Sequence, residues 1–281
     1  MCSVTGMKLT LSTLACPNWT LEQIVNAVSD AKIGGIDFRG LGAEIDITKL
    51  PEFNQRLPAT LELLARHGIQ MPCLNTSITL LTPATERWQM MLEEAQRTAR
   101  LAEKTRTRFM RVFGGSVPRD MSRQQALMLA RRHLRQLVKI AATFGCMPIL
   151  ETHDDWSGSA DMLELVREFD PAEVGVLWDI EHPFRRGEEP CDTFQALKRF
   201  LRHVHVKDSV RVNNKNSPRL LGEGDLPVRQ CVSELIAGGY DGWYCLETEK
   251  RWHAEAPEPE QSVPQFARYM RSIRADKQVA S

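Results

Sequence analysis

The sequence predicts an α/β fold in which eight strand–helix units close into a single (β/α)8 barrel. Three observations support this prediction. Eight short apolar runs are spaced along the chain, segments with helical periodicity separate successive runs, and several of these segments end in glycine just before the next run. Eight such units in about 250 residues are typical of a barrel. We expect one domain over residues 1–281, with 276–281 as a loose tail.

The apolar runs have the length of buried strands. They are KLTLSTL (8–14), GGIDFRG (34–40), IQMPCLN (69–75), RFMRVFGG (108–115), MPILETH (147–153), VGVLWDIEH (174–182), HVHVKD (203–208) and WYCLETE (243–249). Between the first two runs, TLEQIVNAVSDAKI carries apolar residues at i, i+3, i+4 and i+7 from Leu21, and Thr20 with Gln23 forms a capping box. The alternative α/β fold, a doubly wound open sheet, commonly has a glycine-rich phosphate turn after its first strand. LACPNWT follows that strand here, which favours the barrel.

Composition narrows the partners that we expect. The 36 Lys and Arg residues balance the 36 Asp and Glu residues, so no strong field attracts polyanions and we expect no nucleic-acid partner. No run approaches the roughly 20 apolar residues of a membrane span, and the first residues lack an apolar signal segment. Seven cysteines without a CxxC pair are typical of reduced thiols, so we expect a cytoplasmic protein. Met1 and Met7 are both candidate translation starts.

Residues that bind metal ions end four consecutive predicted strands, the fifth to the eighth. In chain order they are Glu151, Asp179, His205 and Glu247. Each shares a strand face with the residue two positions earlier, a parity consistent with all four facing the barrel axis. Their intervals of 28, 26 and 42 residues lie near the roughly 31 residues per unit of such a barrel, with a long loop after the seventh strand. We expect these side chains to converge at the C-terminal end of the barrel.

Three carboxylates and one imidazole suit one divalent metal ion. This oxygen-rich set favours Mn²⁺, with Mg²⁺ and Co²⁺ as alternatives, and Zn²⁺ also accepts such ligands. Taken singly, the residues have plainer interpretations. A glutamate at a strand end is more often a rim charge, and His203 is a hydrogen-bonded packing histidine. Lys207 pairs, in this plainer interpretation, with Asp179 or Glu247.

Such a site supports acid–base chemistry on a sugar or polyol. The ion acts as a Lewis acid on a carbonyl oxygen and a neighbouring hydroxyl, which stabilises an enediolate. Glu151 and Glu247, on the fifth and eighth strands, are placed to flank the substrate while also contacting the metal. One carboxylate removes the proton on carbon, and its return to the opposite face or to the adjacent carbon gives epimerisation or aldose–ketose isomerisation.

These residues carry a family resemblance. LETHD (150–154), WDIEH (178–182), HVHVKD (203–208), GEGDLP (222–227) and GGYDGWYCLETE (238–249) are the motifs, and GIDFRG (35–40) matches the second strand. The chain resembles the xylose isomerase-like TIM-barrel superfamily, in its sugar phosphate isomerase/epimerase branch. The motifs span the C-terminal half and are specific for the superfamily, not for the substrate.

The resemblance implies roles for individual residues. It implies that the metal ligands are Glu151, Asp179, His205 and Glu247, and that Glu151 and Glu247 are catalytic. His182 matches a substrate-contacting histidine, and Arg211 a position where some ketose 3-epimerases place a substrate-binding arginine. We add Lys207, at the barrel mouth, to the expected substrate-binding residues. Where ketose epimerases often carry a further glutamate, six residues after the first ligand, this chain has Ser157.

Alternative functions exist on the same barrel. An apurinic-site endonuclease needs further histidines on strands two to four, and FRG, LNT and FGG supply none. Metal-dependent dehydratases acting on inosose or 3-dehydroshikimate resemble the chain equally well at the four ligands. A non-catalytic sugar-binding protein is the third alternative. We expect a metal-dependent isomerase or epimerase of carbohydrate metabolism acting on a small ketose, polyol or keto-sugar, phosphorylated or not, in a chain that forms a homodimer or homotetramer.

Overall fold

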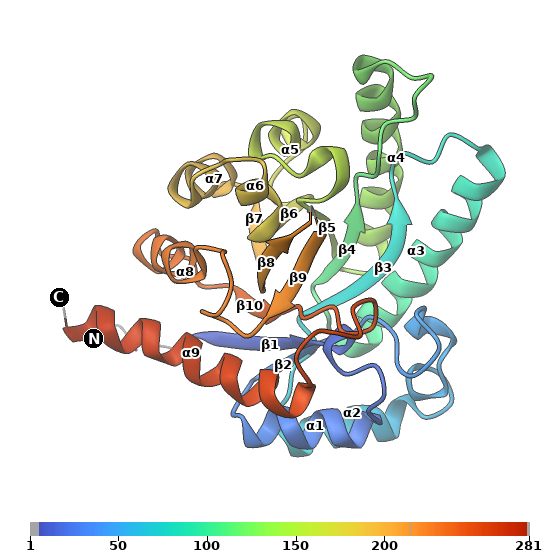
Figure 1. Ribbon diagram of the computed structural model, residues 1–281. Helices are drawn as coiled ribbons and strands as arrows, with labels where there is room; N and C mark the ends of the chain where they lie inside the picture. The colour runs from blue at the N-terminus through green and yellow to red at the C-terminus, as the bar shows by residue number, and fades with distance from the viewer. Residues whose placement is uncertain (1–5, 214, 280–281) are drawn as a thin grey trace.

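Eight parallel strands form one nearly closed barrel in the described part of the chain (Figure 1). The computed structural model describes residues 6–213 and 215–279, with side chains to residue 275. The strand order in the sheet is β2-β1-β10-β7-β6-β5-β4-β3. Isolated parallel bridges from Gly35 to Gln70 and from Phe38 to Leu74 link the two ends of this order. The predicted single (β/α)8 barrel is therefore confirmed.

Strands and helices alternate around the barrel. The strands are β1 (Lys8–Ser12), β2 (Gly35–Asp37), β3 (Cys73–Thr79), β4 (Phe109–Phe113), β5 (Met147–Glu151), β6 (Gly175–Asp179), β7 (Leu201–Val206), β8 (Asp208–Val212), β9 (Lys215–Arg219) and β10 (Trp243–Leu246). The helices are α1 (Leu21–Asp30), α2 (Leu57–Arg66), α3 (Thr85–Thr105), α4 (Arg123–Thr143), α5 (Ser159–Val166), α6 (Glu181–Arg185), α7 (Pro190–Leu197), α8 (Val228–Ala237) and α9 (Pro259–Val279). Short 3₁₀ turns cover Thr13–Ala15, Ile47–Lys49, Pro51–Phe53 and Asp154–Trp156.

Helix α1 begins where the sequence predicts, because its cap is encoded locally. The Gln23 backbone N–H donates to Thr20 Oγ1 at 3.3 Å, and the Thr20 N–H donates to the Gln23 side-chain oxygen at 2.8 Å. These bonds satisfy two backbone groups that the first turn leaves without helical partners. The apolar face of α1 is buried against the barrel.

Strand β3 differs from the sequence expectation of 69–75, since it begins at Cys73 and runs to Thr79. Pro72 has no backbone N–H, so it cannot donate to a strand ladder. The polar residues of CLNTSIT do not form an apolar run, so the pattern does not indicate a buried strand. A buried hydroxyl is nevertheless hydrogen-bonded here, since Thr76 Oγ1 donates to the Arg111 carbonyl at 2.8 Å. A buried strand can therefore carry hydroxyls when neighbouring backbone accepts from them.

The run HVHVKD is also divided differently from the expectation. β7 ends at Val206, and Asp208 opens an antiparallel hairpin of β8 and β9. The Asp208 carboxylate accepts the backbone N–H groups of Gly222 and Gly224 at 2.8 and 3.1 Å. A Cβ on Gly224 would lie 2.0 Å from Asp208 Oδ1, so the GEGD turn needs glycine for this close approach. The hairpin stands at the C-terminal end of the barrel, where β7 ends.

The barrel interior changes character along its axis. An apolar cluster lies in its N-terminal half and extends to the middle of β5 and β6; it is formed by Cys73, Phe109, Met147, Ile149 and Leu177. A larger apolar core lies between the strands and the outer helices. Ionisable side chains of β5, β6 and β7 follow the apolar cluster toward the C-terminal end. The apolar cluster therefore separates that polar end from the opposite mouth.

The C-terminal helix α9 runs across the molecule next to α1 and α8 (Figure 1). Its backbone continues to Val279, so the helix includes part of the segment expected as a loose tail. Residues 280–281 lie outside the described residues. No helix in 6–213 or 215–279 combines the length and the apolar character needed to cross a membrane.

Candidate functional site

Four ligand-type side chains meet at the C-terminal end of the barrel. They are Glu151 on β5, Asp179 on β6, His205 on β7 and Glu247 just after β10, and all four are buried. One ligand atom from each lies within 4.8 Å of the others. His205 Nδ1 lies 3.5 Å from Glu151 Oε1 and 3.0 Å from Glu247 Oε2. We call these four residues the ligand cluster.

The ligand cluster fits a divalent cation by its chemistry. Glu151 Oε2, Asp179 Oδ2 and Glu247 Oε2 are buried and are contacted by basic side chains, whereas His205 Nε2 is buried without a hydrogen-bond partner among the described residues. Three carboxylates brought this close repel one another, and a shared cation removes that repulsion. A Cys-free set of oxygens with one imidazole suits Mn²⁺, Mg²⁺, Co²⁺ or Zn²⁺.

Two basic side chains already balance part of this negative charge. Lys207 Nζ lies 2.7 Å from Asp179 Oδ2 and 2.8 Å from Glu247 Oε2. Arg111 on β4 is buried, and its Nε lies 3.2 Å from Glu151 Oε2. With His205 neutral, as a metal ligand must be, these two cations against three carboxylates leave one negative charge, which a divalent ion would change to one positive charge.

The pKa values follow from burial and this crowding. Burial raises the pKa of the Glu151 carboxyl, as does Glu247 beside it, but Arg111 and His205 outweigh both and bring it to about 2. Burial lowers the pKa of His205, but the two glutamates outweigh it and raise the pKa to about 10. Burial raises the pKa of Asp179 to about 7 despite Lys207. Since a metal ligand must be deprotonated, cation binding at this cluster would displace the His205 proton.

His203 lies one layer below His205 and is fully buried. Its Nε2–H donates to Asp37 Oδ2 at 2.6 Å, and Thr10 Oγ1 donates to Asp37 Oδ1 at 3.1 Å. The expectation of a hydrogen-bonded packing histidine is confirmed. The two imidazoles on one face of β7 therefore have different surroundings: His205 lies in the ligand cluster, and His203 bonds to Asp37 one layer below it.

The three expected substrate-binding residues lie in different surroundings. Lys207 and His182 both line a cavity of about 500 Å³ above the ligand cluster. His182 Nε2 lies 3.7 Å from Asp179 Oδ2, and burial lowers the pKa of this imidazole to about 4. Arg211 lies on β8 with an exposed side chain, outside the lining of this cavity. Its backbone N–H donates to Asp225 Oδ2 at 2.9 Å.

Sequence reasoning missed Arg111 and Asp37. Arg111 stands between Phe109 and Phe113 on alternate positions of β4, and its side chain also donates to the Thr76 carbonyl. A charge within an apolar strand requires a buried partner, which is a usable signal. Asp37 lies in GIDFRG and shows the same signal. Neither partner could be named without knowing which strands are neighbours.

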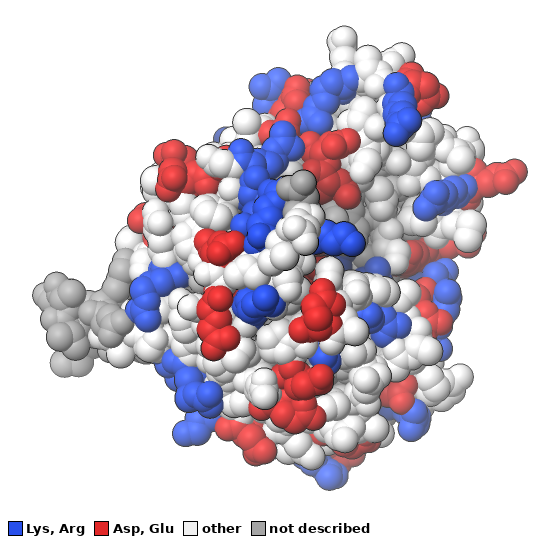
Figure 2. All heavy atoms as spheres, in the orientation of Figure 1, with Lys and Arg blue, Asp and Glu red and all other residues white. Residues whose placement is uncertain are grey.

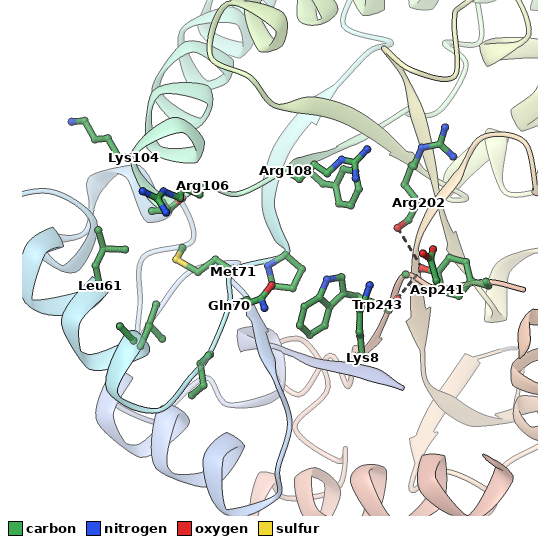
Figure 3. Close-up of a pocket in the computed structure, with 18 of the residues that line it drawn as sticks. Lys8, Leu61, Gln70, Met71, Lys104, Arg106, Arg108, Arg202, Asp241 and Trp243 are labelled. Carbon is green, nitrogen blue, oxygen red and sulfur yellow. Dashed lines mark hydrogen bonds between the residues drawn. The ribbon is translucent and has the colours of Figure 1, made fainter. Parts of the chain in front are cut away.

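A cavity of about 960 Å³ lies at the opposite mouth of the barrel (Figure 3). Its lining includes Lys8, Arg108, Arg202 and Trp243, each of which is the first residue of β1, β4, β7 or β10 or stands next to it. In (β/α)8 enzymes the active site lies at the C-terminal ends of the strands. The smaller cavity, which contains Glu247 of the ligand cluster, is therefore the candidate active site.

Comparison with known proteins agrees with this fold. One curated relative is an inosose dehydratase of Geobacillus thermodenitrificans, 29% identical over 136 residues, a match that spans 42% of this chain and 45% of the relative. A solved structure of a D-tagatose 3-epimerase-like protein has a TM-score of 0.78 at 16% identity and covers 96% of this chain and 99% of its own. The IOLI protein, solved with a bound zinc atom, has a TM-score of 0.77 at 16% identity, covering 96% of this chain and 97% of its own.

Proteins similar to this chain thus include a dehydratase, an epimerase-like protein and a protein solved with a bound zinc atom. The model of the xylose isomerase-like TIM barrel family matches residues 25–273, which is most of the chain. The sequence-based recognition is confirmed, and the protein belongs to the xylose isomerase-like TIM barrel family.

Proposed function

We propose that the protein is a divalent-metal-dependent isomerase or epimerase of a small keto-sugar or polyol. The observation that carries this proposal is the convergence of three buried carboxylates and one imidazole within 4.8 Å at the C-terminal end of the barrel. The residues that would hold the ion are Glu151, Asp179, His205 and Glu247. Once bound, the ion supplies Lewis acidity to a substrate carbonyl and its neighbouring hydroxyl.

The chain's own side chains supply the proton transfers. Glu151 and Glu247 come from β5 and from the residue after β10, on either side of His205. In our proposal one carboxylate accepts the proton from the carbon beside the carbonyl, and the other returns a proton. Lys207, between Asp179 and Glu247, donates to substrate oxygens on which charge develops, and His182 orients a hydroxyl from the cavity wall. The exposed position of Arg211 leaves it the weakest of our substrate-binding proposals.

A dehydratase is the second candidate, favoured by the match to an inosose dehydratase. It shares the first step, proton removal beside a carbonyl, and then expels a hydroxyl instead of returning the proton. The ligand cluster serves both reactions, so the outcome depends on which group donates a proton to the departing hydroxyl.

The test is a substrate screen in D₂O. Ketoses, inososes and 3-dehydroshikimate are incubated with the protein and Mn²⁺, and NMR follows deuterium at carbon and the products. An isomerase or epimerase incorporates deuterium and changes configuration or carbonyl position, whereas a dehydratase forms an unsaturated ketone. Retention of every carbon-bound proton, together with no metal in elemental analysis, would contradict both candidates.

A further inference from the structure

Trp252 is an exposed aromatic at the edge of the candidate active site. Its side chain is 57% exposed, and the other large exposed apolar side chains of the described residues are Met90, Met128 and Val212. Met90 and Met128 lie on the outer helices α3 and α4, whereas Trp252 follows β10 by a few residues. Trp252 offers an apolar ring face beside a polar cavity, and a ligand with an apolar face of its own can stack on such a ring.

Trp252 belongs to two hollows at once. It lines the 500 Å³ cavity that also contains Lys207 and Glu247. It also lines a second, more open hollow of about 950 Å³ formed with Trp19, Asn18 and residues of the loops after β1 and β2. We call this second hollow the Trp19 groove. Because one indole forms a wall of both, the groove adjoins the cavity above the ligand cluster.

The loop that carries Trp252 is held in place. The Arg251 backbone N–H donates to the Leu14 carbonyl at 3.1 Å, and its guanidinium donates to the carbonyls of Gly42 and Ala43. Arg251 Cζ lies 5.4 Å from the centre of the Trp252 ring. In Figure 1 this loop passes beside the segments that follow β1 and β2. The indole is therefore a positioned surface, which lowers the entropic cost of binding.

Charge narrows the chemistry of a ligand that would occupy both hollows. Five carboxylates line the cavity against the two amines of Lys207 and Lys215, and Lys207 already contacts two of the acidic side chains of the ligand cluster. The Trp19 groove is balanced, with Glu22 and Glu52 against Arg56 and Arg251. Figure 2 shows both signs interspersed over this face of the molecule. Neither hollow offers the surplus of cations that a phosphate group needs.

We propose that the substrate is an uncharged glycoside rather than a free or phosphorylated monosaccharide. This inference rests on the proposed function. The reacting keto-sugar ring lies at the ligand cluster, and the second ring stacks on Trp252 and extends into the Trp19 groove. The C–H face of a pyranose ring is apolar and suits an indole, while its hydroxyls bond to side chains such as Glu249, Glu255 and Asn216 of the cavity.

The experiment compares matched probes on the metal-loaded protein. D-fructose and isomaltulose, which is fructose carrying a glucosyl unit, form one pair; 3-dehydroglucose and phenyl 3-dehydroglucoside form another. Deuterium exchange in D₂O gives kcat/KM for each. We expect the glycosylated member of the accepted pair to be preferred about tenfold. Trp252→Ala should remove this preference through a higher KM for the glycosylated member, whereas Trp252→Phe should retain it.

Control measurements distinguish an effect on binding in the Trp19 groove from an effect on the reaction at the ligand cluster. Met128→Ala removes another exposed apolar side chain, on α4, and should leave the preference and the exchange rates unchanged. Tryptophan fluorescence titrated with maltitol and with sorbitol reports binding without turnover, and only maltitol should require Trp252. If none of the probes exchanges deuterium, the proposed function is contradicted. The fluorescence titration still tests whether the Trp19 groove binds the second ring. Equal use of both pair members, equal maltitol binding by Trp252→Ala, or a smaller oligomer of that variant in light scattering would overturn the glycoside proposal.

Discussion

The two mouths of the barrel differ in how their charges are arranged. At the C-terminal end, acidic and basic side chains are buried and point at one another: Lys207 bridges Asp179 and Glu247 at under 3 Å. At the N-terminal end, Lys8 and Arg108 are exposed around a floor that includes Met71 and Trp243 (Figure 3). The N-terminal cavity is the larger, about 960 against about 500 Å³.

The convergence of buried charged side chains, and not the volume of the cavity, therefore distinguishes the end with the candidate active site. Charged groups that remain in water keep their hydration, so separating them from opposite charges costs little free energy. The exposed basic side chains at the N-terminal mouth are therefore stable without a partner or a ligand. Charges withdrawn from water need partners or a ligand, and the protein folds despite their cost. Each barrel strand runs from one mouth to the other, so residues at its two ends form matched pairs for testing this difference.

The largest effect is expected on β10. Glu247 follows this strand at the C-terminal end, and Asp241 precedes it at the other mouth. Glu247→Gln keeps the shape but removes the base, so deuterium exchange should fall by about 10²–10⁴-fold. Asp241→Asn should change the rate less than about twofold, because its carboxylate is exposed. NMR in D₂O measures both rates, and normal exchange by Glu247→Gln would remove this residue from the mechanism.

Strand β4 offers the next comparison, between Arg111 and Arg108. Arg111 is buried against Glu151, whereas Arg108 is exposed, with its guanidinium 5.4 Å from the Phe109 ring centre. Arg111→Met leaves Glu151 without its guanidinium, and the free energy of unfolding should fall by about 3–5 kcal/mol. Arg108→Met should cost under about 0.5 kcal/mol. Urea denaturation distinguishes them; similar losses would mean that burial does not separate the two mouths.

Which site residues can be predicted from the sequence depends on whether their interactions are local or join distant parts of the chain. Glu151, Asp179 and His205 were found because strand parity and strand ends are local properties that period-two patterns reveal. The partners of the cluster depend on which strands are neighbours. Arg111 meets Glu151 only because β4 pairs with β5 in the register Phe113 opposite Glu151.

The contacts of the loops are harder still to predict from the sequence. The capping box of α1 is set by residues three apart and was predicted correctly. Trp252 lies near Trp19 only because Arg251 reaches the carbonyls of Gly42 and Ala43, more than 200 residues away in sequence. No local pattern records such a contact. The same holds for β3, in whose polar second half the Thr76 hydroxyl donates to the Arg111 carbonyl of β4.

A comparison of residues at the two ends of β6 tests whether the ligand cluster binds a divalent cation. Asp179 ends this strand in the ligand cluster, and Glu173 stands exposed just before its first residue. Mn²⁺ at 100 times its Kd should stabilise the protein by about 2.7 kcal/mol, since it binds only the folded state. Asp179→Asn should lose most of this gain and Glu173→Gln none, as thermal melts with and without Mn²⁺ would show. An unchanged melting temperature for the parent protein would contradict a metal centre.

The smallest effect concerns the layer between the two mouths, where Asp37 accepts from His203. Asp37→Asn keeps the volume and weakens a buried, charge-assisted bond, so the free energy of unfolding should fall by about 1–3 kcal/mol. If this layer is structural, the Mn²⁺ gain survives, because neither side chain is needed to ligate the ion. Urea denaturation repeated with Mn²⁺ measures both quantities. Loss of the gain would extend the functional end one layer deeper, with the Asp37–His203 pair orienting His205 from below.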